Sequence, residues 1–239
     1  MSSPDESSGA EEVRASSDER DELREGIVER FREELGDALV ASHVRAGDDV
    51  WIRVSTGAWR EAAKVARDKL HFHHFTFLSA IDWLPSPYGR YLDAEVDREE
   101  PPTVQVPDTF ETGYAGGETR FQVFARVARV IEKPYLGVTL KADVPEDLTI
   151  DSWVPVYAGA NWHEREVWDM FGIRFKDHPH LERIYLPADF EGHPLRKDFP
   201  LLARHIKPWP GIVDVEGMPG EGESTDDTPE SQSETEVGA

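Results

Sequence analysis

The stretch from residue 161 to residue 200 places the tightest limit on how this 239-residue chain folds. Its second part carries prolines at Pro179, Pro187, Pro194 and Pro200. Proline lacks a backbone N–H and clashes with the preceding helical turn, so neither a long helix nor a central strand can run through this part. The same part holds too many apolar residues for a solvated linker. We therefore predict an extended, partner-wrapping arm over residues 173–210.

A short helix is predicted just before the arm, over Trp162–Phe171, within a helical region near residues 152–171. Gly172 stands where a left-handed C-terminal residue is expected. Charged residues lie among aromatic ones on this helix and need partners. Arg165 and Asp169 are spaced to pair on the helix itself, and this leaves Glu164 and Glu166 to find donors on another surface.

The residues upstream predict a compact α+β domain over residues 18–172. Helical spacing of apolar residues, turn-forming residues and strict alternation indicate the elements in turn. The order is a helix over 18–36, a hairpin of strands 39–44 and 50–54, a helix capped by Ser55 or Thr56 and ended by His71, a buried central strand over 72–84, and two amphipathic strands over 120–127 and 136–144 with a turn at 132–134. A two-layer sandwich, with a mixed sheet and helices on one face, is the expected architecture.

Three segments lie outside this regular pattern. Residues 85–118 are rich in proline, glycine and acidic residues and are predicted to be an extended or flexible insertion. Residues 1–17 and 211–239 are acidic and poor in apolar residues, so we expect disordered tails. Much of the net charge of −22 falls on these tails, which leaves a moderately acidic domain.

Composition excludes several classes of function. An acidic chain repels nucleic acid and anionic lipid surfaces. The chain has no cysteine, so disulfides, thiolate catalysis and cysteine-ligated clusters are excluded. No apolar run reaches the ~18 residues of a membrane span and the first 21 residues have no apolar core of a secretory signal, so we expect the chain to stay in the cytoplasm.

Histidines and carboxylates offer two sharper hypotheses. His71, His73 and His74 form a cluster, for which hydrogen-bonded imidazoles at a helix–strand junction are favoured over a metal site. His178, His180 and His193 are interpreted as interface residues rather than metal ligands. Glu164, Glu166 and Asp169 are not accompanied by a nucleophile or a phosphate loop, so an interface ion-pair network is preferred to catalysis.

The sequence EREVWDMFGI at residues 164–173, followed by HPHLERIYLPADFEGHPLRKDFP at 178–200, closely resembles the defining motif of the thirty-kilodalton (C) subunit family of NADH-quinone oxidoreductase, or complex I. FTFLSAIDW and RFQVFARV upstream resemble the body of that family more weakly. The resemblance covers roughly residues 24–200. The insertion, Phe190 where a tryptophan is commoner, and Lys176-Asp177 before His178 depart from the family pattern.

The resemblance implies a peripheral-arm subunit of the proton-translocating NADH:quinone oxidoreductase, respiratory complex I, that binds no cofactor and has no catalytic or metal residues of its own. NADH, FMN, iron–sulfur clusters and quinone are expected on other subunits, and the chain would act by scaffolding electron transfer. The chief expected partner is the quinone-pocket (D) subunit, with the iron–sulfur (B and I) subunits nearby, at the cell membrane, peripheral, on the cytoplasmic side. Ordering of the arm would be coupled to assembly. The expected interface residues are Glu164, Arg165, Glu166, Asp169, His178, His193, Arg196, Lys197 and Asp198.

Three alternatives remain open. Homologous subunits serve membrane-bound hydrogenases and related dehydrogenase complexes. A stand-alone metal-dependent hydrolase would use the histidines. A monomeric adaptor with acidic tails would have an arm that is protected without partners.

Overall fold

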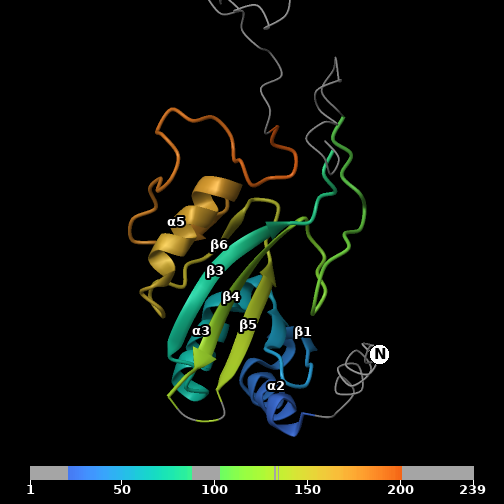
Figure 1. Cartoon of the computed structure of the whole chain (residues 1–239), viewed down its shortest axis with the longest axis vertical. Helices are drawn as coiled ribbons and strands as arrows, with labels where there is room; N and C mark the ends of the chain where they lie inside the picture. The colour runs from blue at the N-terminus through green and yellow to red at the C-terminus, as the bar shows by residue number, and fades with distance from the viewer. Residues whose placement is uncertain (1–20, 88–102, 132, 134, 201–239) are drawn as a thin grey trace, which may run out of the picture. The chain divides into compact units, whose positions relative to one another are not determined.

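The computed structural model describes residues 21–87, 103–131, 133 and 135–200. Its centre is a five-stranded mixed sheet with the strand order β1-β2-β5-β4-β3 (Figure 1). Strands β2 and β5 are parallel, and the other neighbouring pairs are antiparallel. The strands are β1, Leu39–His43; β2, Val50–Val54; β3, His74–Asp82; β4, Phe121–Arg129; and β5, Leu136–Asp143.

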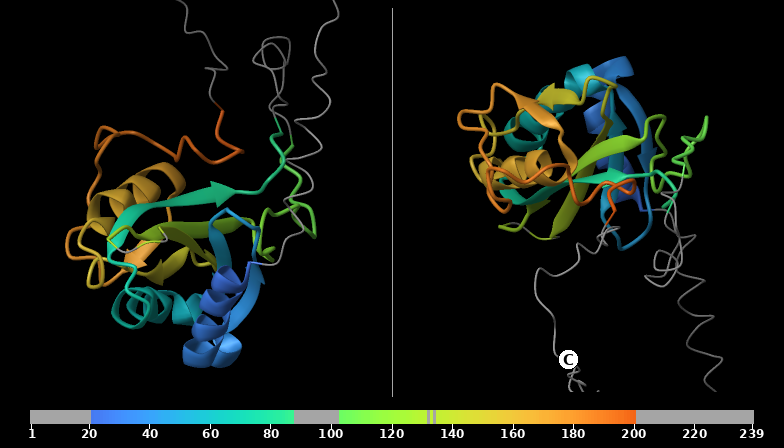
Figure 2. Two further views of the ribbon diagram at one scale, coloured as in Figure 1. Left: turned by 60° about the horizontal axis from the view of Figure 1, so that its bottom comes forward. Right: turned by 90° about the horizontal axis from the view of Figure 1, so that it is seen from above.

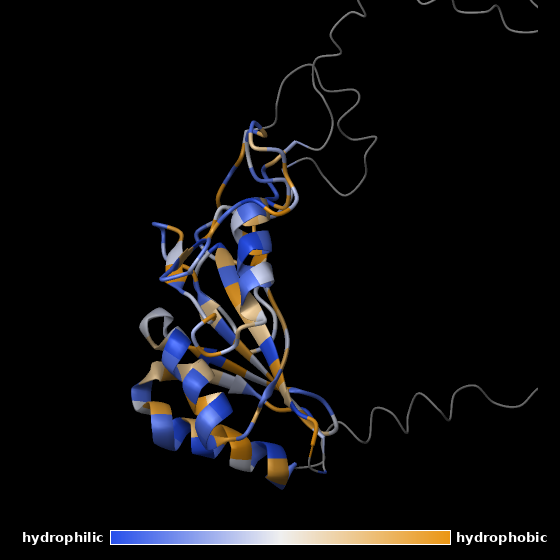
Figure 3. Cartoon of the chain, turned by 90° about the vertical axis from the view of Figure 1, so that its left-hand side faces the viewer, coloured by the Kyte–Doolittle hydropathy of each residue, from blue (hydrophilic) through white to orange (hydrophobic). Residues whose placement is uncertain are grey.

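Helices cover one face of this sheet and form the predicted second layer. One buried apolar cluster joins Phe31 of the first helix, Trp59 of the second and Val167 of the last to the inward residues of the strands. Hydrophobic and hydrophilic residues alternate along the strands, as Figure 3 shows. The helical elements are α2, Glu22–Leu35; η2, Gly36–Ala38; η3, Thr56–Ala58; α3, Trp59–Lys64; the π-helical turn η4, Val65–Lys69; and α5, Ala160–Phe171.

The second helical region differs from prediction at its start. Trp59, Ala63, Ala66 and Leu70 are buried as the helical spacing predicts. Neither Ser55 nor Thr56 caps the helix through its side chain, and the Thr56 hydroxyl donates to the Asp143 carbonyl oxygen instead. The capping prediction is wrong because the sheet offers that hydroxyl a competing acceptor.

Strand β3 lies at the edge of the sheet rather than in its centre. Its apolar run predicts burial on both faces, and packing by other elements provides much of this burial. Helix α5 packs against β3, where Phe75 contacts the rings of Tyr157 and His163. A covered edge strand therefore has the composition of a central one.

Strand β5 is the central strand, between β2 and β4. Its alternating sequence predicts one solvated face, yet Thr139 and Lys141 on that face are buried. The covering residues come from the segment predicted as a flexible insertion. Two residues of this segment bond to β5. The Tyr114 carbonyl oxygen accepts from Lys141 Nζ, and the Glu118 N–H donates to Asp143. The part of the insertion that precedes β4 is thus packed on the sheet, while residues 88–102 lie outside the described residues.

A small parallel pair, which the sequence did not indicate, connects the domain to the arm. Strand β6, Thr149–Asp151, pairs with β7, Arg174–Lys176. From residue 177 to residue 200 the chain runs in turns and irregular backbone. The predicted tails, 1–17 and 211–239, and arm residues 201–210 lie outside the described residues. In the part of the chain that the structure covers, no helix is long and apolar enough to cross a bilayer.

Candidate partner interface

Helix α5 and the arm form one unit (Figure 2). The helix ends at Gly172, which has a φ of 77° and donates its N–H to the Trp168 carbonyl oxygen, as predicted. A Cβ at Gly172 would lie 2.5 Å from Arg196 Nη2 and 2.6 Å from His193 Nε2. Glycine therefore permits both the left-handed turn and the close approach of the returning arm.

Asp169 is the main anchor of the arm. Its Oδ2 accepts the N–H groups of Ile184, Tyr185 and Leu186 at 3.0 to 3.2 Å, and its Oδ1 accepts from Arg183 Nη1 at 2.9 Å. The side chain is buried. Burial alone would raise the pKa of this carboxyl, but the three backbone donors and the Arg183 charge hold it below its ordinary value.

The predicted Arg165–Asp169 pair is wrong. Arg165 instead donates to the carbonyl oxygens of Glu182 and Arg183, at 3.0 Å each. Both α5 side chains thus fasten the arm to the helix. An i, i+4 pair on a helix surface contributes only about 0.2–0.5 kcal/mol, so the arm's backbone groups compete with it successfully.

Glu164 faces the interior, not a partner surface. It is fully buried, and it accepts from Ser152 Oγ at 2.6 Å and from the Trp153 N–H at 2.5 Å. Burial raises its pKa to about 7. The expectation that Glu164 needs a partner's donors is corrected, because the loop before α5 supplies them.

His178 lies beside this buried carboxyl. Its Nε2 is 4.0 Å from Glu164 Oε2 and 3.2 Å from the Asn161 carbonyl oxygen, and its side chain is buried. Burial lowers the pKa of this imidazole. His178 therefore joins the start of the arm to the first turn of α5.

A second anchor holds the far end of the arm. Asp82, the acidic residue of the apolar strand β3, accepts from Arg120 Nε and Nη2 at 2.9 and 2.7 Å. It also accepts the Lys197 N–H at 2.8 Å, and Asp198 Oδ1 lies 2.9 Å from Arg120 Nη2. Charge-assisted bonds of this kind are stronger than neutral ones, so this cluster joins the arm to the edge of the sheet.

His193 and Arg196 complete the contact. His193 Nδ1 lies 2.9 Å from the Asp169 carbonyl oxygen, and Arg196 Nε donates to the Phe171 carbonyl oxygen at 2.6 Å. These side chains reach carbonyl groups of the last turn of α5, which have no N–H donor inside the helix. Seven of the nine predicted interface residues thus bond within the chain through their side chains: Glu164, Arg165, Asp169, His178, His193, Arg196 and Asp198.

The outer surface of α5 and the arm remains open. Trp162 is 67% exposed, Tyr185 62% and Leu195 50%. Glu166 makes no hydrogen bond or ion pair within the described part of the chain, and the side chain of Lys197 is exposed. We call these five residues the outer face. Exposed aromatic residues with unpaired charges have the composition of a protein–protein contact.

Sequence reasoning missed Asp82, Arg120 and Arg183 as residues that hold the site. Asp82 gave a signal, since one carboxylate in an apolar strand requires a partner. Arg120 and Arg183 gave none, because their partners are distant in the chain or on an irregular segment.

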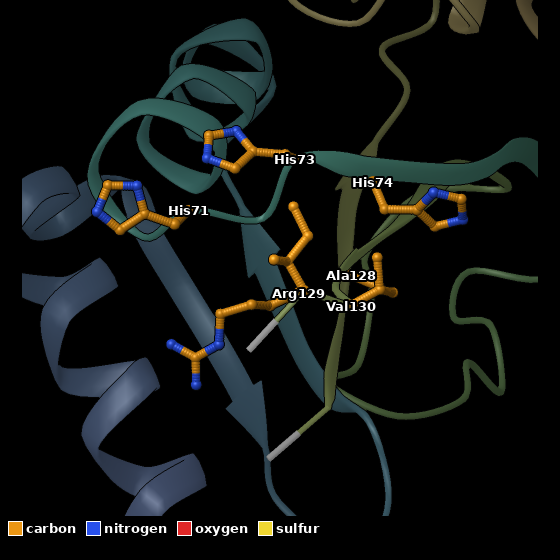
Figure 4. Close-up of a pocket in the computed structure, with 7 residues that line it drawn as sticks. His71, His73, His74, Ala128, Arg129 and Val130 are labelled. Carbon is orange, nitrogen blue, oxygen red and sulfur yellow. The ribbon is translucent and has the colours of Figure 1, made fainter. Parts of the chain in front are cut away.

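The three-histidine cluster lines a pocket of about 490 Å³ with Arg129, Val130 and Ile131 (Figure 4). The rings of His71 and His73 are 5.6 Å apart, and His74 extends away from them. Among the described residues no group of three or more His, Asp or Glu side chains is placed to hold a metal ion.

Fold and site together define a two-layer α+β domain that carries a C-terminal arm folded onto its own last helix by buried carboxylates. Within this class, the family model for the respiratory-chain NADH dehydrogenase, 30 Kd subunit, matches residues 52–205. The chain belongs to that family. The match includes most of the sheet, α5 and the whole described arm.

Curated relatives carry names from the same enzyme. The C subunit of the NADH-quinone oxidoreductase of Brucella ovis is 45% identical over 98 residues, which are 41% of this chain and 48% of that protein. The C/D subunit of the same enzyme from Pseudomonas fluorescens is 36% identical over 174 residues, 72% of this chain and 27% of that protein. The C/D subunit of Chromohalobacter salexigens is 47% identical over 95 residues, 39% and 16%. The chain thus spans between 16% and 48% of the length of these relatives.

Solved structures resemble this chain at low sequence identity. A chain of the membrane-bound sulfane sulfur reductase, an archaeal respiratory membrane complex, is 18% identical, with a TM-score of 0.50 over 82% of this chain and 100% of that one. A trypsin-resistant fragment of Nqo5 is 19% identical, with a TM-score of 0.46 over 66% of this chain and 98% of the fragment.

Proposed function

We propose that this chain is the thirty-kilodalton (C) component of a proton-translocating NADH:quinone oxidoreductase, respiratory complex I, in whose peripheral arm it acts as a scaffold. The observation that carries the proposal is the family match over residues 52–205, which includes both the sheet and the α5–arm unit. Relatives named as C or C/D subunits of NADH-quinone oxidoreductase support it. In this role the chain makes or breaks no covalent bond.

The quinone-pocket (D) subunit is the proposed chief partner, with the iron–sulfur (B and I) subunits nearby. The relatives named C/D support the first of these, because their single polypeptides bear both subunit names. The outer face is the proposed contact surface, since its aromatic residues are exposed and Glu166 has no partner within the described part of the chain. Interfaces of this kind are centred on large aromatic residues surrounded by polar ones.

The scaffold role follows from how the outer face is held. Asp169 and Asp82 fix the arm at two points, through seven hydrogen bonds to groups on the arm and on Arg120. A face held in one geometry can position a partner without a large ordering cost on binding. The proposed consequence is that neighbouring electron carriers stay at fixed separations.

In this proposal the cofactors are bound by other subunits, and the location of the chain is set by the complex. NADH, FMN, iron–sulfur clusters and quinone would be bound by other subunits. The chain would be peripheral at the cell membrane on its cytoplasmic side, held there by its partners. A hydrogenase or related dehydrogenase complex is the competing assembly, and the identity of the co-purifying subunits separates the two.

The test is affinity purification of the tagged chain from detergent-solubilised membranes, with mass spectrometry of the eluate and an NADH:quinone activity assay. We expect quinone-site, iron–sulfur and proton-channel subunits to co-elute with activity. Recovery of nickel-site hydrogenase subunits would establish the competing assembly, and recovery of the chain alone would contradict both.

A matched pair of variants tests the contact surface in the same assay. Glu166→Ala combined with Trp162→Ala should lower recovery of the quinone-pocket subunit at least tenfold, because interface aromatics carry much of the binding energy. Glu33→Ala, an exposed carboxylate on α2, should leave recovery unchanged. Equal recovery with both variants would place the contact elsewhere on the domain.

A further inference from the structure

The face of the sheet opposite the helices contains an apolar pocket of about 230 Å³. Register places Trp51, Ile81 and Phe124 on this face with Lys141, because Phe124 and Lys141 are directly paired and the others alternate with inward residues. Trp83 and Tyr114 complete the walls. This pocket lies on the opposite face of the sheet from α5, although Asp82, which binds the arm, lies between the pocket residues Ile81 and Trp83 in the chain.

The segment that forms one wall of the pocket, residues 113–117, is a loop packed against side chains of the sheet. The Gly116 N–H donates to the Gly113 carbonyl oxygen, and Arg53 Nε donates to the Ala115 carbonyl oxygen at 3.0 Å. A Cβ at Gly117 would lie 1.9 Å from Gln122 Nε2, so the backbone lies directly on the strand side chains. The Tyr114 ring stacks on His43 at 4.3 Å. The wall is therefore held from three strands.

Lys141 is one of the residues that line this apolar pocket, and its ammonium is buried. It is 3% exposed, donates to the Tyr114 carbonyl oxygen at 2.8 Å, and lies 5.6 Å from the centre of the Trp83 ring. Asp143, the nearby carboxylate, is bonded to Arg53 and Gln122 instead. An ammonium has three N–H donors, so this one has donors left over within the described part of the chain.

The electrostatic state of Lys141 agrees with this geometry. Burial lowers its pKa to about 8, with Arg53 acting in the same direction and Asp143 against it. A buried cation without a full set of acceptors is costly, and an anion brought to it would recover part of that cost. The Lys141 ammonium thus has more donors than acceptors among the described residues, and the pocket that it lines has apolar walls.

Size limits what can enter. An engineered apolar cavity of about 150 Å³ in another protein binds benzene. A volume of about 230 Å³ accommodates one aromatic ring with a short chain. Ligand pockets of this type combine apolar walls with one or two polar groups that fix orientation.

We propose that this pocket binds an apolar monocarboxylate, with its ring between Trp51, Ile81 and Phe124 and its carboxylate on Lys141. The ligand takes up the spare donors of the ammonium and covers the apolar wall. This site is distinct from the surface proposed for subunit assembly, and it stands whether or not that assembly is the right one.

The first experiment is calorimetric titration of the full-length chain with 3-phenylpropanoate and with its neutral analogue 3-phenylpropanamide. We expect the acid to bind at least tenfold more tightly, a difference of about 1.4 kcal/mol. Lys141→Met keeps the length of the side chain and removes the charge. This variant should bind the acid and the amide with about equal affinity. Lys64→Met on α3, which is exposed and outside the pocket, should keep it.

A second readout does not depend on the stability of the Lys141 variant. Carbon-13 NMR of the lysine ε-carbons should show the Lys141 pKa rising toward its ordinary value when the acid is added, because a bound anion favours the charged amine. Ile81→Trp fills the pocket and should abolish binding of both probes. An unchanged Lys141 titration, or equal binding of acid and amide, would overturn the proposal.

The same chemistry is offered by a free acid and by the C-terminal phenylalanine of another chain. A tripeptide Ala-Ala-Phe with a free carboxylate, compared with its amide, separates these sources. Tighter binding of the peptide than of 3-phenylpropanoate supports the site with a chain end as its ligand, and weaker binding supports it with a free acid. Absence of binding by both acids would overturn it.

Discussion

At the scale of single residues, burial separates the carboxylates of α5 into two kinds. Glu164 and Asp169 are buried and bonded within the chain, whereas Glu166 is half-buried and has no partner among the described residues. The sequence predicted that Asp169 pairs with Arg165 on the helix and that Glu164 and Glu166 find donors on another surface. Their different roles depend on which groups the preceding loop and the following arm bring near, and residue spacing on the helix does not encode this.

Glu164→Gln tests the internal role through pH. The pKa of Glu164 is raised from 4.5 to about 7. A raised carboxyl pKa means that the folded chain holds a proton that the unfolded chain loses, so this contribution to stability is complete below about 4.5 and is lost as pH rises through about 7. Glutamine stays neutral, so the stability of the variant relative to the native chain should increase by about 1–3 kcal/mol between pH 5 and pH 8.

Denaturant unfolding at the two pH values measures this change. Asp143, Asp169 and Asp198 have lowered pKa values and act in a lower pH range, and they are common to both chains. Glu166→Gln serves as the control and should shift stability by less than about 0.5 kcal/mol at either pH. A constant difference between the Glu164 variant and the native chain would contradict the buried, protonated state.

Asp169→Ala tests the anchor. The substitution leaves three backbone N–H groups and Arg183 Nη1 without their acceptor. We expect the free chain to lose about 2–4 kcal/mol of unfolding free energy, as with other buried charge networks. Thermal unfolding of the purified chain measures it. A loss no greater than that of Glu166→Ala would show that the arm is not held by this carboxylate.

At the scale of elements, patterns with a clear period gave the correct structure. The hairpin, the strands β4 and β5, the apolar stripe of α3 and the glycine end of α5 all follow from local spacing. The order of the strands in the sheet does not follow from local spacing, because β3 has the composition of a central strand yet lies at the edge. The pair β6–β7 is three residues long in each strand and has no periodic signal. The arm was predicted to be extended and to wrap a partner, but its contacts with acceptors within the chain were not foreseen.

Two glycine-to-alanine substitutions should change stability in opposite directions. Gly172 tests the junction of helix and arm, and Gly26 in α2 is the control. Gly172→Ala should destabilise the chain by about 1–3 kcal/mol, because its φ is 77° and the new Cβ would meet Arg196 and His193. Gly26→Ala in α2, where nothing lies within 4 Å, should stabilise it by about 0.5–1 kcal/mol. Melting temperatures measure both, and the same sign for both would contradict the geometry of the junction.

Hydrogen exchange tests whether the arm folds without partners. The N–H groups of Tyr185 and Leu186 are bonded to Asp169, so they should exchange at least about tenfold more slowly than those of Asp189 and Glu191 in the purified chain. Uniformly fast exchange would restore the view that the arm orders only on assembly. Slow exchange is also expected of a monomeric adaptor, so the co-purification experiment is needed to separate the two.

At the scale of the whole molecule, the sequence predicted the α+β architecture correctly because hydrophobic periodicity indicates which faces of the helices and strands form the shared core. It did not predict that both faces of the sheet are partly covered. Residues 113–118 cover the face of the sheet opposite the helices. Their sequence is that of an ordinary loop, and their contacts with Gln122 and Lys141 have no local signal. The predicted interface residues all lie on α5 or the arm, but they include residues that hold the arm as well as residues that face outward, and their role in binding a partner stays a prediction.

Deletion of residues 220–239 tests the role of one acidic end. The segment carries acidic residues and no lysine or arginine, and we predict that the complex assembles without it because it has few apolar groups to bury. Subunit recovery equal to that of the full chain is the expected result. Failure of assembly with normal folding of the truncated chain would assign the segment a binding role.

The two anchors of the arm close loops of very different length. Asp169 reaches the backbone of residues 184 to 186 across 15 to 17 positions of the chain, whereas Asp82 reaches Lys197 across 115. Loop closure costs more entropy as the loop grows, so the short-range anchor can form while the chain is still emerging from the ribosome and the long-range one must follow the sheet. In a newly made chain the arm would therefore be folded before a partner binds. Association would then proceed at the rates of preformed surfaces and would not be limited by a folding step.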